Sequence, residues 1–320
     1  MNRLLASAAI GILACGSPAA QNAIFDSYLS SAQKASAKGD WAAAENFLKL
    51  AEAEADGNRA KLAKLWGSQA AVAEPQFKYA ATEAGRKKEL AYAEETETRT
   101  KEGKLYIAHL QTLLANHYRL REMHDEAAAL YKKALTTRER LNGPKAWETA
   151  QLLRDIADNK RDAGELGAAE PIYRRAIEIV AGIKGREYHL AFCLANLGEL
   201  QLRQGKVDEA EALCRQALDL YEKVPGQFPL NLALCDATLG EALRKQKKVE
   251  EAAQMFATAL KRIDPPPGTP ARSLPILKSA AAFYRENGRT AEAKKLDDQI
   301  KEIEDKHKRA IAEASRDRQP

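Results

Sequence analysis

Five arginines recur at nearly constant spacing along the chain. Arg119, Arg161, Arg203, Arg244 and Arg285 stand 42, 42, 41 and 41 residues apart. A guanidinium group can bind a carboxylate through two parallel hydrogen bonds, so a row of arginines on one surface would suit acidic side chains or a terminal carboxylate. Positive charge near the end of a helix is also favoured by the helix dipole alone. The spacing therefore leaves two interpretations open, a binding surface and a structural preference.

Polar or acidic residues accompany four of these arginines. Asn116, Asp158, Glu199 and Glu241 each stand three or four residues earlier in the chain, one turn of a helix away. Arg203 is one residue out of phase with the other arginines, and the acidic neighbours would neutralise part of the row. The candidate partner-binding groove predicted from the sequence consists of Asn116, Arg119, Asp158, Arg161, Glu199, Arg203, Glu241, Arg244 and Arg285.

Other residue types that could carry chemistry are scattered. The chain has no phosphate-cradling glycine loop, nucleophile elbow or HExxH motif. His109, His117 and His124 lie eight and seven residues apart, whereas two metal ligands on one helix face would stand about four apart. We therefore expect no metal, no cofactor and no catalytic residues, and the protein is predicted not to be an enzyme.

The cysteines allow two interpretations. Cys193, Cys214 and Cys235 are spaced by 21 residues, and no CxxC pair occurs. If the protein is exported, one disulfide among the three is compatible with this spacing. The alternative, which we favour, is that each cysteine is a small buried apolar residue.

The elements that must position these residues are helices in a repeat. An alanine after a short polar turn recurs at intervals of 83, 42, 41, 42 and 41 residues, and a second small residue precedes each alanine by twelve. Apolar residues between them follow the three- and four-residue steps of one helix face. Two antiparallel helices per unit, crossing at the small residues, are predicted. The paired positions are Ala32 and Ala44, Ala115 and Ala127, Ala157 and Ala169, Gly198 and Ala210, Gly240 and Ala252, and Ala281 and Ala293.

The run from Leu194 to Gly198, followed by Gly205 to Glu211, resembles a tetratricopeptide repeat, and the 42-residue period is similar to that of the kinesin-light-chain-like subclass. The resemblance implies an all-α solenoid of six to seven stacked helix pairs. It also implies that first helices line a concave surface that receives peptides. Pro75 and Gly85 are expected to interrupt the repeat. The predicted parts are an N-terminal unit at 25–57, a degenerate helical unit at 58–104, the repeat array at 105–290, and a capping helix and tail at 291–320.

The first twenty residues resemble an export signal. Arg3 precedes an uncharged run of ten residues, which is too short to span a bilayer but suits the core of a secretory signal. The run ends in Ile12-Leu13-Ala14-Cys15-Gly16, similar to the lipobox of bacterial lipoproteins, in which the cysteine is acylated. Cleavage after Ala19 or Ala20 would instead release a soluble protein, and an uncleaved intracellular chain is the third alternative.

Bulk composition agrees with an interaction protein rather than a nucleic-acid-binding one. The 320 residues are 45% hydrophobic and 30% charged, with only 6% aromatic residues, as expected for thin helical layers. A net charge of +5 from 50 basic and 45 acidic residues gives no concentrated basic surface for nucleic acid. The sequence thus predicts a lipid-anchored scaffold of the bacterial cell envelope that binds a protein or peptide, with a cytoplasmic adaptor or regulator as the alternative.

Overall fold

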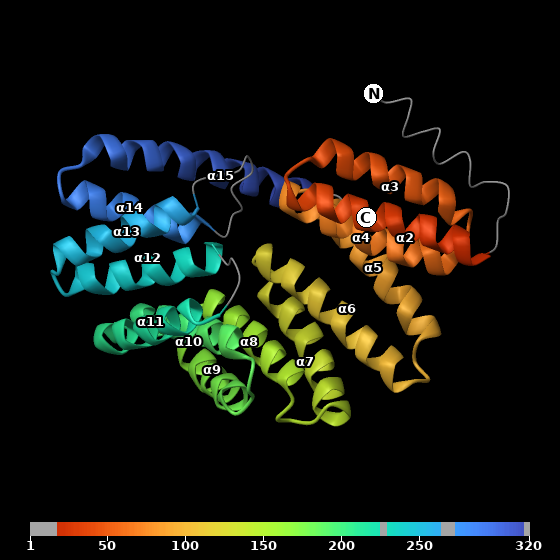
Figure 1. The fold of residues 1–320 in the computed structure, drawn as a ribbon, viewed down its shortest axis with the longest axis horizontal. Coiled ribbons are helices and arrows are strands. Elements are labelled where there is room, and N and C mark those ends of the chain that lie inside the picture. The colour runs from red at the N-terminus through yellow and green to blue at the C-terminus, as the bar shows by residue number, and fades with distance from the viewer. Residues whose placement is uncertain (1–17, 225–228, 264–272, 317–320) are drawn as a thin grey trace. The chain divides into compact units, whose positions relative to one another are not determined.

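The computed structural model describes residues 18–224, 229–263 and 273–316, and over these residues the chain is built of α-helices joined by short turns (Figure 1). No strand occurs in the described ranges. Consecutive helices form antiparallel pairs, so the α-solenoid predicted from the sequence is confirmed. The chain divides into two compact units between residues 92 and 93, inside the helix α5. The N-terminal run with Cys15 lies outside the described residues.

The first unit holds the helices predicted for the N-terminal and degenerate repeats. Its core gathers Phe25 and Leu29 with Leu48, Leu65 and Val72 from the next two helices. Burial of each large apolar side chain stabilises the unit by about 1.5–3 kcal/mol. The elements are α2 (Pro18–Ala37), α3 (Trp41–Ala55), α4 (Arg59–Ala73), the 3-10 helix η1 (Glu74–Gln76) and most of α5 (Tyr79–Thr96).

Gly85 does not interrupt a helix, contrary to the expectation from the sequence. It lies inside α5, where a Cβ atom would stand 2.7 Å from the backbone oxygen of Trp66 and 3.1 Å from the Cβ of Ala70, both in α4. Only glycine permits so close an approach of the two backbones. Pro75, by contrast, lies in η1 and marks the interval between α4 and α5, because proline is well placed at the start of a helical turn.

The second unit is a stack of five helix pairs. Each second helix packs against the first helix of its own pair, and successive pairs pack together. The capping helix predicted for the C-terminal segment is present and, with 27 residues, is about twice the length of its partner of 13 residues. The elements are α6 (Lys101–Leu120), α7 (His124–Leu141), α8 (Trp147–Asp162), α9 (Leu166–Ala181), α10 (Glu187–Arg203), α11 (Val207–Glu222), α12 (Pro229–Lys245), α13 (Val249–Arg262), α14 (Leu274–Glu286) and α15 (Thr290–Arg316).

The repeated small residues lie where the two helices of each pair cross. All six alanines that follow the turns are at most 2% exposed, and the small residues twelve positions earlier are buried as well. At Gly198 a Cβ atom would come within 2.9 Å of Cys214 Sγ in the second helix of the same pair. A larger residue at these crossings would separate the backbones and leave the pair poorly packed. The period read from the sequence is therefore a packing period.

The turn between the two helices of a pair repeats with the same beat. One residue in each turn has a left-handed backbone, and its amide donates to the carbonyl three residues earlier. Glycine meets this requirement without strain in four turns, whereas Glu122 and Lys247 adopt positive φ in the other two. The six positions are Gly39, Glu122, Gly164, Gly205, Lys247 and Gly288. None of the described helices has the length and apolar character needed to cross a bilayer.

Candidate functional site

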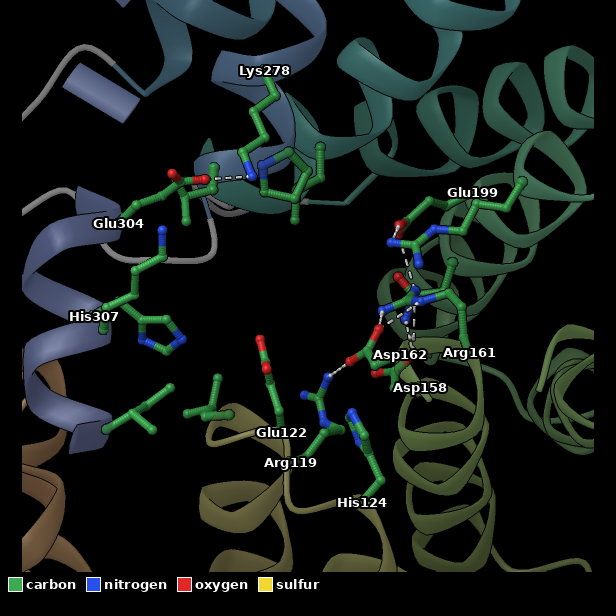
Figure 2. A pocket seen from close by; sticks show the side chains of 18 of the residues that line it. Arg119, Glu122, His124, Asp158, Arg161, Asp162, Glu199, Lys278, Glu304 and His307 are labelled. Atoms are coloured by element: carbon green, nitrogen blue, oxygen red, sulfur yellow. Dashed lines mark hydrogen bonds and ion pairs between the residues drawn. The ribbon is translucent and has the colours of Figure 1, made fainter. Parts of the chain in front are cut away.

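A cavity of about 930 Å³ lies within the second unit, between the first helices of successive pairs and the C-terminal helices (Figure 2). Figure 2 shows Arg161 and Glu199 on one side and Glu304 and His307 on the other, with open space between them. We call the two sides the repeat wall and the α15 wall. The repeat wall consists of Arg119, Leu120, Glu122, His124, Asp158, Arg161, Asp162, Phe192, Asn196, Glu199, Arg203 and Leu234. The α15 wall consists of Leu274, Pro275, Lys278, Glu304, His307, Lys308, Ile311 and Ala312.

Five of the nine predicted groove residues therefore line one cavity, but Arg161 is engaged within the chain. Its Nη1 lies 3.0 Å from Glu199 Oε2 in the next pair, and its Nη2 lies 3.0 Å from the neighbouring Asp162 Oδ1. The side chain of Arg161 is only 9% exposed. Burial alone would lower the pKa of this guanidinium, but Glu199, Asp158 and Asp162 offset it, and the pKa stands well above its usual value. Arg161 thus joins two repeat pairs as a permanent cation.

Arg119 repeats the arrangement one unit earlier. Its Nη1 donates to Asp162 Oδ2 at 2.6 Å, so Asp162 accepts from the arginines of two successive pairs. Burial raises the pKa of the Asp162 carboxyl, but Arg161 and Arg119 lower it more, and the net pKa lies below its usual range. The carboxylate remains ionised and completes a charged network between α6, α8 and α10.

Arg244 and Arg285 follow the same rule, and Arg203 does not. Arg244 binds both oxygens of Glu286 in α14 and both oxygens of Glu241 in its own helix at 2.6–2.7 Å. Arg285 binds Asp297 in α15. These arginines donate their carbonyl to the left-handed residue of the turn, whereas Arg203 is one position later. Its side chain is 43% exposed and pairs only with Glu199 in its own helix.

The polar residues that follow the crossings divide into two kinds. Asn116 accepts a hydrogen bond from the hydroxyl of Tyr131 at 2.6 Å, and Asp158 accepts one from the hydroxyl of Tyr173. In the next two pairs the residue fifteen positions later is cysteine or phenylalanine, which offers no hydroxyl. Glu199 and Glu241 pair with arginines instead. Asn116 itself does not line the cavity described above.

A second cavity of about 650 Å³ adjoins the first and shares several of its residues. Its lining carries four basic side chains, Arg203, Arg244, Lys245 and Lys278, and two acidic ones, Glu199 and Glu241. We call this region the basic corner. Lys245 and Lys278 are 42% and 55% exposed, and Lys278 pairs with Glu304 of α15. Ion pairs this exposed contribute about 0–1 kcal/mol, so a ligand carboxylate could exchange with them readily.

Sequence reasoning missed the acceptors Asp162 and Glu286 and the lining residues of α15. The first two had a signal, because each directly follows an arginine of the row, as Arg161-Asp162 and Arg285-Glu286. The α15 residues had a helical signal only: Glu304, His307, Lys308, Ile311 and Ala312 share one face by their spacing. Nothing in the sequence states which surface that face meets.

The histidines and cysteines have structural surroundings. His124 lines the cavity with its Nδ1 3.1 Å from Asn159 Oδ1, and in the described part of the chain no three His, Cys, Asp or Glu side chains are grouped for a metal ion. Cys193, Cys214 and Cys235 are buried free thiols. Burial raises the pKa of Cys193 to about 12, which makes its thiolate scarce. The three cysteines occupy the positions of small buried residues.

The family model for the tetratricopeptide repeat matches residues 106–181 and 190–263. No curated protein matches the chain in sequence. The matched segments cover α6 to α9 and α10 to α13, the pairs that form most of the repeat wall.

Several solved structures share the fold at low sequence identity. Aspartyl phosphate phosphatase F from Bacillus subtilis is 14% identical with a TM-score of 0.69, over 89% of this chain and 71% of that chain. A Rap protein complexed with Competence and Sporulation Factor is 12% identical with a TM-score of 0.60, over 91% and 99%. NprR in complex with its cognate peptide NprX is 16% identical with a TM-score of 0.62, over 86% and 77%. The chain is therefore an α-solenoid that carries tetratricopeptide repeats in residues 106–181 and 190–263.

Proposed function

We propose that the protein is a non-catalytic interaction scaffold whose cavity between the repeat wall and the α15 wall receives a peptide segment of a partner protein. The cavity carries this proposal: about 930 Å³ is within the range of ligand sites and open enough for a short chain segment. Two similar structures are complexes, one with Competence and Sporulation Factor and one with the peptide NprX. The ionisable groups of the repeat wall pair with one another and leave no nucleophile beside a base.

The partner segment carries acidic groups, and the arginines available to it are the exposed ones. Arg161 and Arg119 have side chains 9% and 19% exposed and hold carboxylates of the same chain. Arg203 is 43% exposed and bound only by a residue one turn away. A ligand carboxylate displacing such a surface pair loses little, whereas breaking a buried pair would be costly. The basic corner is therefore the part of the predicted groove that meets an acidic group.

A photo-crosslinking side chain in place of Leu234 tests the proposal in the native host. Leu234 lies on the repeat wall and lines both cavities, and an apolar crosslinker conserves its character. The matched control carries the crosslinker at Lys133, an exposed position in α7 outside both cavities. We expect a discrete crosslinked protein band from position 234 and none from position 133. Equal bands at the two positions, or no band at 234, would contradict a partner site in the cavity.

The protein is anchored to the bacterial cell envelope through Cys15. The support is the apolar run and the lipobox-like residues before Cys15 in the sequence. Several acyl chains on one residue give stable attachment, whereas a single chain is marginal. We expect the intact mass from the membrane fraction to correspond to a chain that begins at acylated Cys15, and a Cys15→Ser variant to leave that fraction. Recovery of Cys15→Ser in the same fraction as the natural chain would contradict the anchor.

A cytoplasmic adaptor with the same cavity is the alternative. It rests on the same repeat array and differs only in the fate of the first twenty residues. A chain of full-length mass with unmodified Cys15 would favour it. The crosslinking result is independent of this choice, because Leu234 and Lys133 lie in the same unit and carry no information on location.

A further inference from the structure

The C-terminal helix α15 gives the cavity a second wall. Only the first half of α15 runs alongside α14, because a helix of 27 residues is about 40 Å long and one of 13 residues about 20 Å. The ion pair of Glu304 with Lys278, at 2.7 Å, lies near the beginning of α14. The part of α15 after Glu304 therefore extends beyond its partner helix and is not required to cap it.

That extension turns a defined face to the repeats. His307, Lys308, Ile311 and Ala312 line the cavity, whereas Arg309 and Glu313 do not. Figure 2 shows Glu304 and His307 on this helix facing the open space, opposite Arg161 and Glu199. Glu122 of the repeat wall also raises the pKa of His307, against a larger lowering by burial, so the two walls are close enough to interact electrostatically.

Both walls offer an apolar section beside charged ones. Phe192 and Leu234 lie on the repeat wall, and Leu274, Pro275 and Ile311 lie on the α15 wall. Leu234, Leu274 and Pro275 continue into the basic corner, where four basic and two acidic side chains line the surface. An apolar side chain held between two apolar surfaces is stabilised by about 25 cal/mol per Å² removed from water.

From this arrangement we infer that the partner is a peptide segment with an apolar side chain next to an acidic group, clasped between the repeats and α15. The apolar side chain lies between Phe192 and Ile311, and the acidic group lies at the basic corner, within reach of Lys278. The inference rests on the proposed function and names its ligand chemistry. It also assigns the end of α15 to binding, since a repeat surface alone would contact only one side of the segment.

The probe is a peptide selected from a random twelve-residue library by panning on the full chain. We expect the selected peptides to share an apolar residue adjacent to Asp, Glu or the C-terminal carboxylate. Fluorescence anisotropy then compares Lys308→Glu with Arg309→Glu, the same charge reversal at neighbouring exposed residues, of which only Lys308 lines the cavity. Lys308→Glu is expected to weaken binding about tenfold, equivalent to about 1.4 kcal/mol. Arg309→Glu is expected to leave it within about twofold.

Two further variants separate this inference from the proposed function. Ile311→Asp places a charge on the apolar section of the α15 wall, and Leu234→Asp does the same on the repeat wall. Both are expected to weaken peptide binding by about tenfold or more, with the far-UV spectrum unchanged. Loss with Leu234→Asp alone, with Ile311→Asp and Lys308→Glu binding normally, would overturn the role of α15 and leave the cavity as the site. If neither variant affects binding, the cavity itself is not the site.

Discussion

Replacing Arg161 by methionine is expected to lower the free energy of unfolding by about 3–5 kcal/mol, because the change leaves buried carboxylates without their cation. Arg161 holds Glu199 at 3.0 Å and Asp162 at 3.0 Å, and Asp158 lies 3.7 Å away. Methionine keeps much of the volume and the unbranched shape, so the loss reports the charge rather than a cavity. Urea unfolding followed by far-UV circular dichroism measures the change as a shift of the midpoint.

Arg203→Met is the matched control for this prediction. It removes the same group from the same row of arginines, but Arg203 is 43% exposed and pairs only within its own helix. Its expected cost is at most about 1 kcal/mol. Equal destabilisation by the two substitutions would show that Arg161 does not join successive pairs in the way the geometry indicates.

Gly85→Ala is expected to destabilise the first unit by about 1–3 kcal/mol, the usual cost of forcing an extra carbon into a well-packed contact. The new Cβ would stand 2.7 Å from the backbone oxygen of Trp66, which cannot rotate away as a side chain can. The helices α4 and α5 would have to separate. The measurement is again urea unfolding, combined with hydrogen exchange of the α4 amides, whose protection is expected to fall.

Gly167→Ala supplies the opposite expectation from the same chemical change. Gly167 lies in the first turn of α9, and a Cβ atom there meets nothing within 4 Å. Alanine in a helix is favoured over glycine by about 0.5–1 kcal/mol, so this variant is expected to be slightly more stable than the natural chain. If Gly85→Ala also stabilises the chain, the close approach of α4 and α5 is wrong.

These contrasts divide the charged residues into two groups with different roles. Arg119, Arg161 and Arg244 bind carboxylates of the following helix pair and stabilise the stack. Arg203 falls one position late, and the following pair has no claim on its side chain. The two interpretations that the spacing left open thus apply to different members of one row: structural at most positions, and available to a partner near the basic corner.

The sequence by itself determined the repeat and its fold. Small residues at a fixed period have one physical cause, the close crossing of two helices, and burial of all six alanines follows from it. The same logic located the turns and the charged terminal helix. Local pattern sufficed here because every contact of this kind lies within a pair or between neighbouring pairs. The wrong expectation at Gly85 arose because glycine is read locally as a helix breaker, whereas its reason is a backbone in another helix.

Only the tertiary structure decided which charges are already satisfied. The partners of Arg119, Arg161 and Arg244 stand 38 to 43 residues away, and the acceptor depends on how successive pairs are rotated against each other. The second wall of the cavity was likewise hidden, because the face of α15 that carries Ile311 is an ordinary helix face in the sequence. Its meaning depends on where a helix longer than its partner extends, and side-chain periodicity carries no information on that direction.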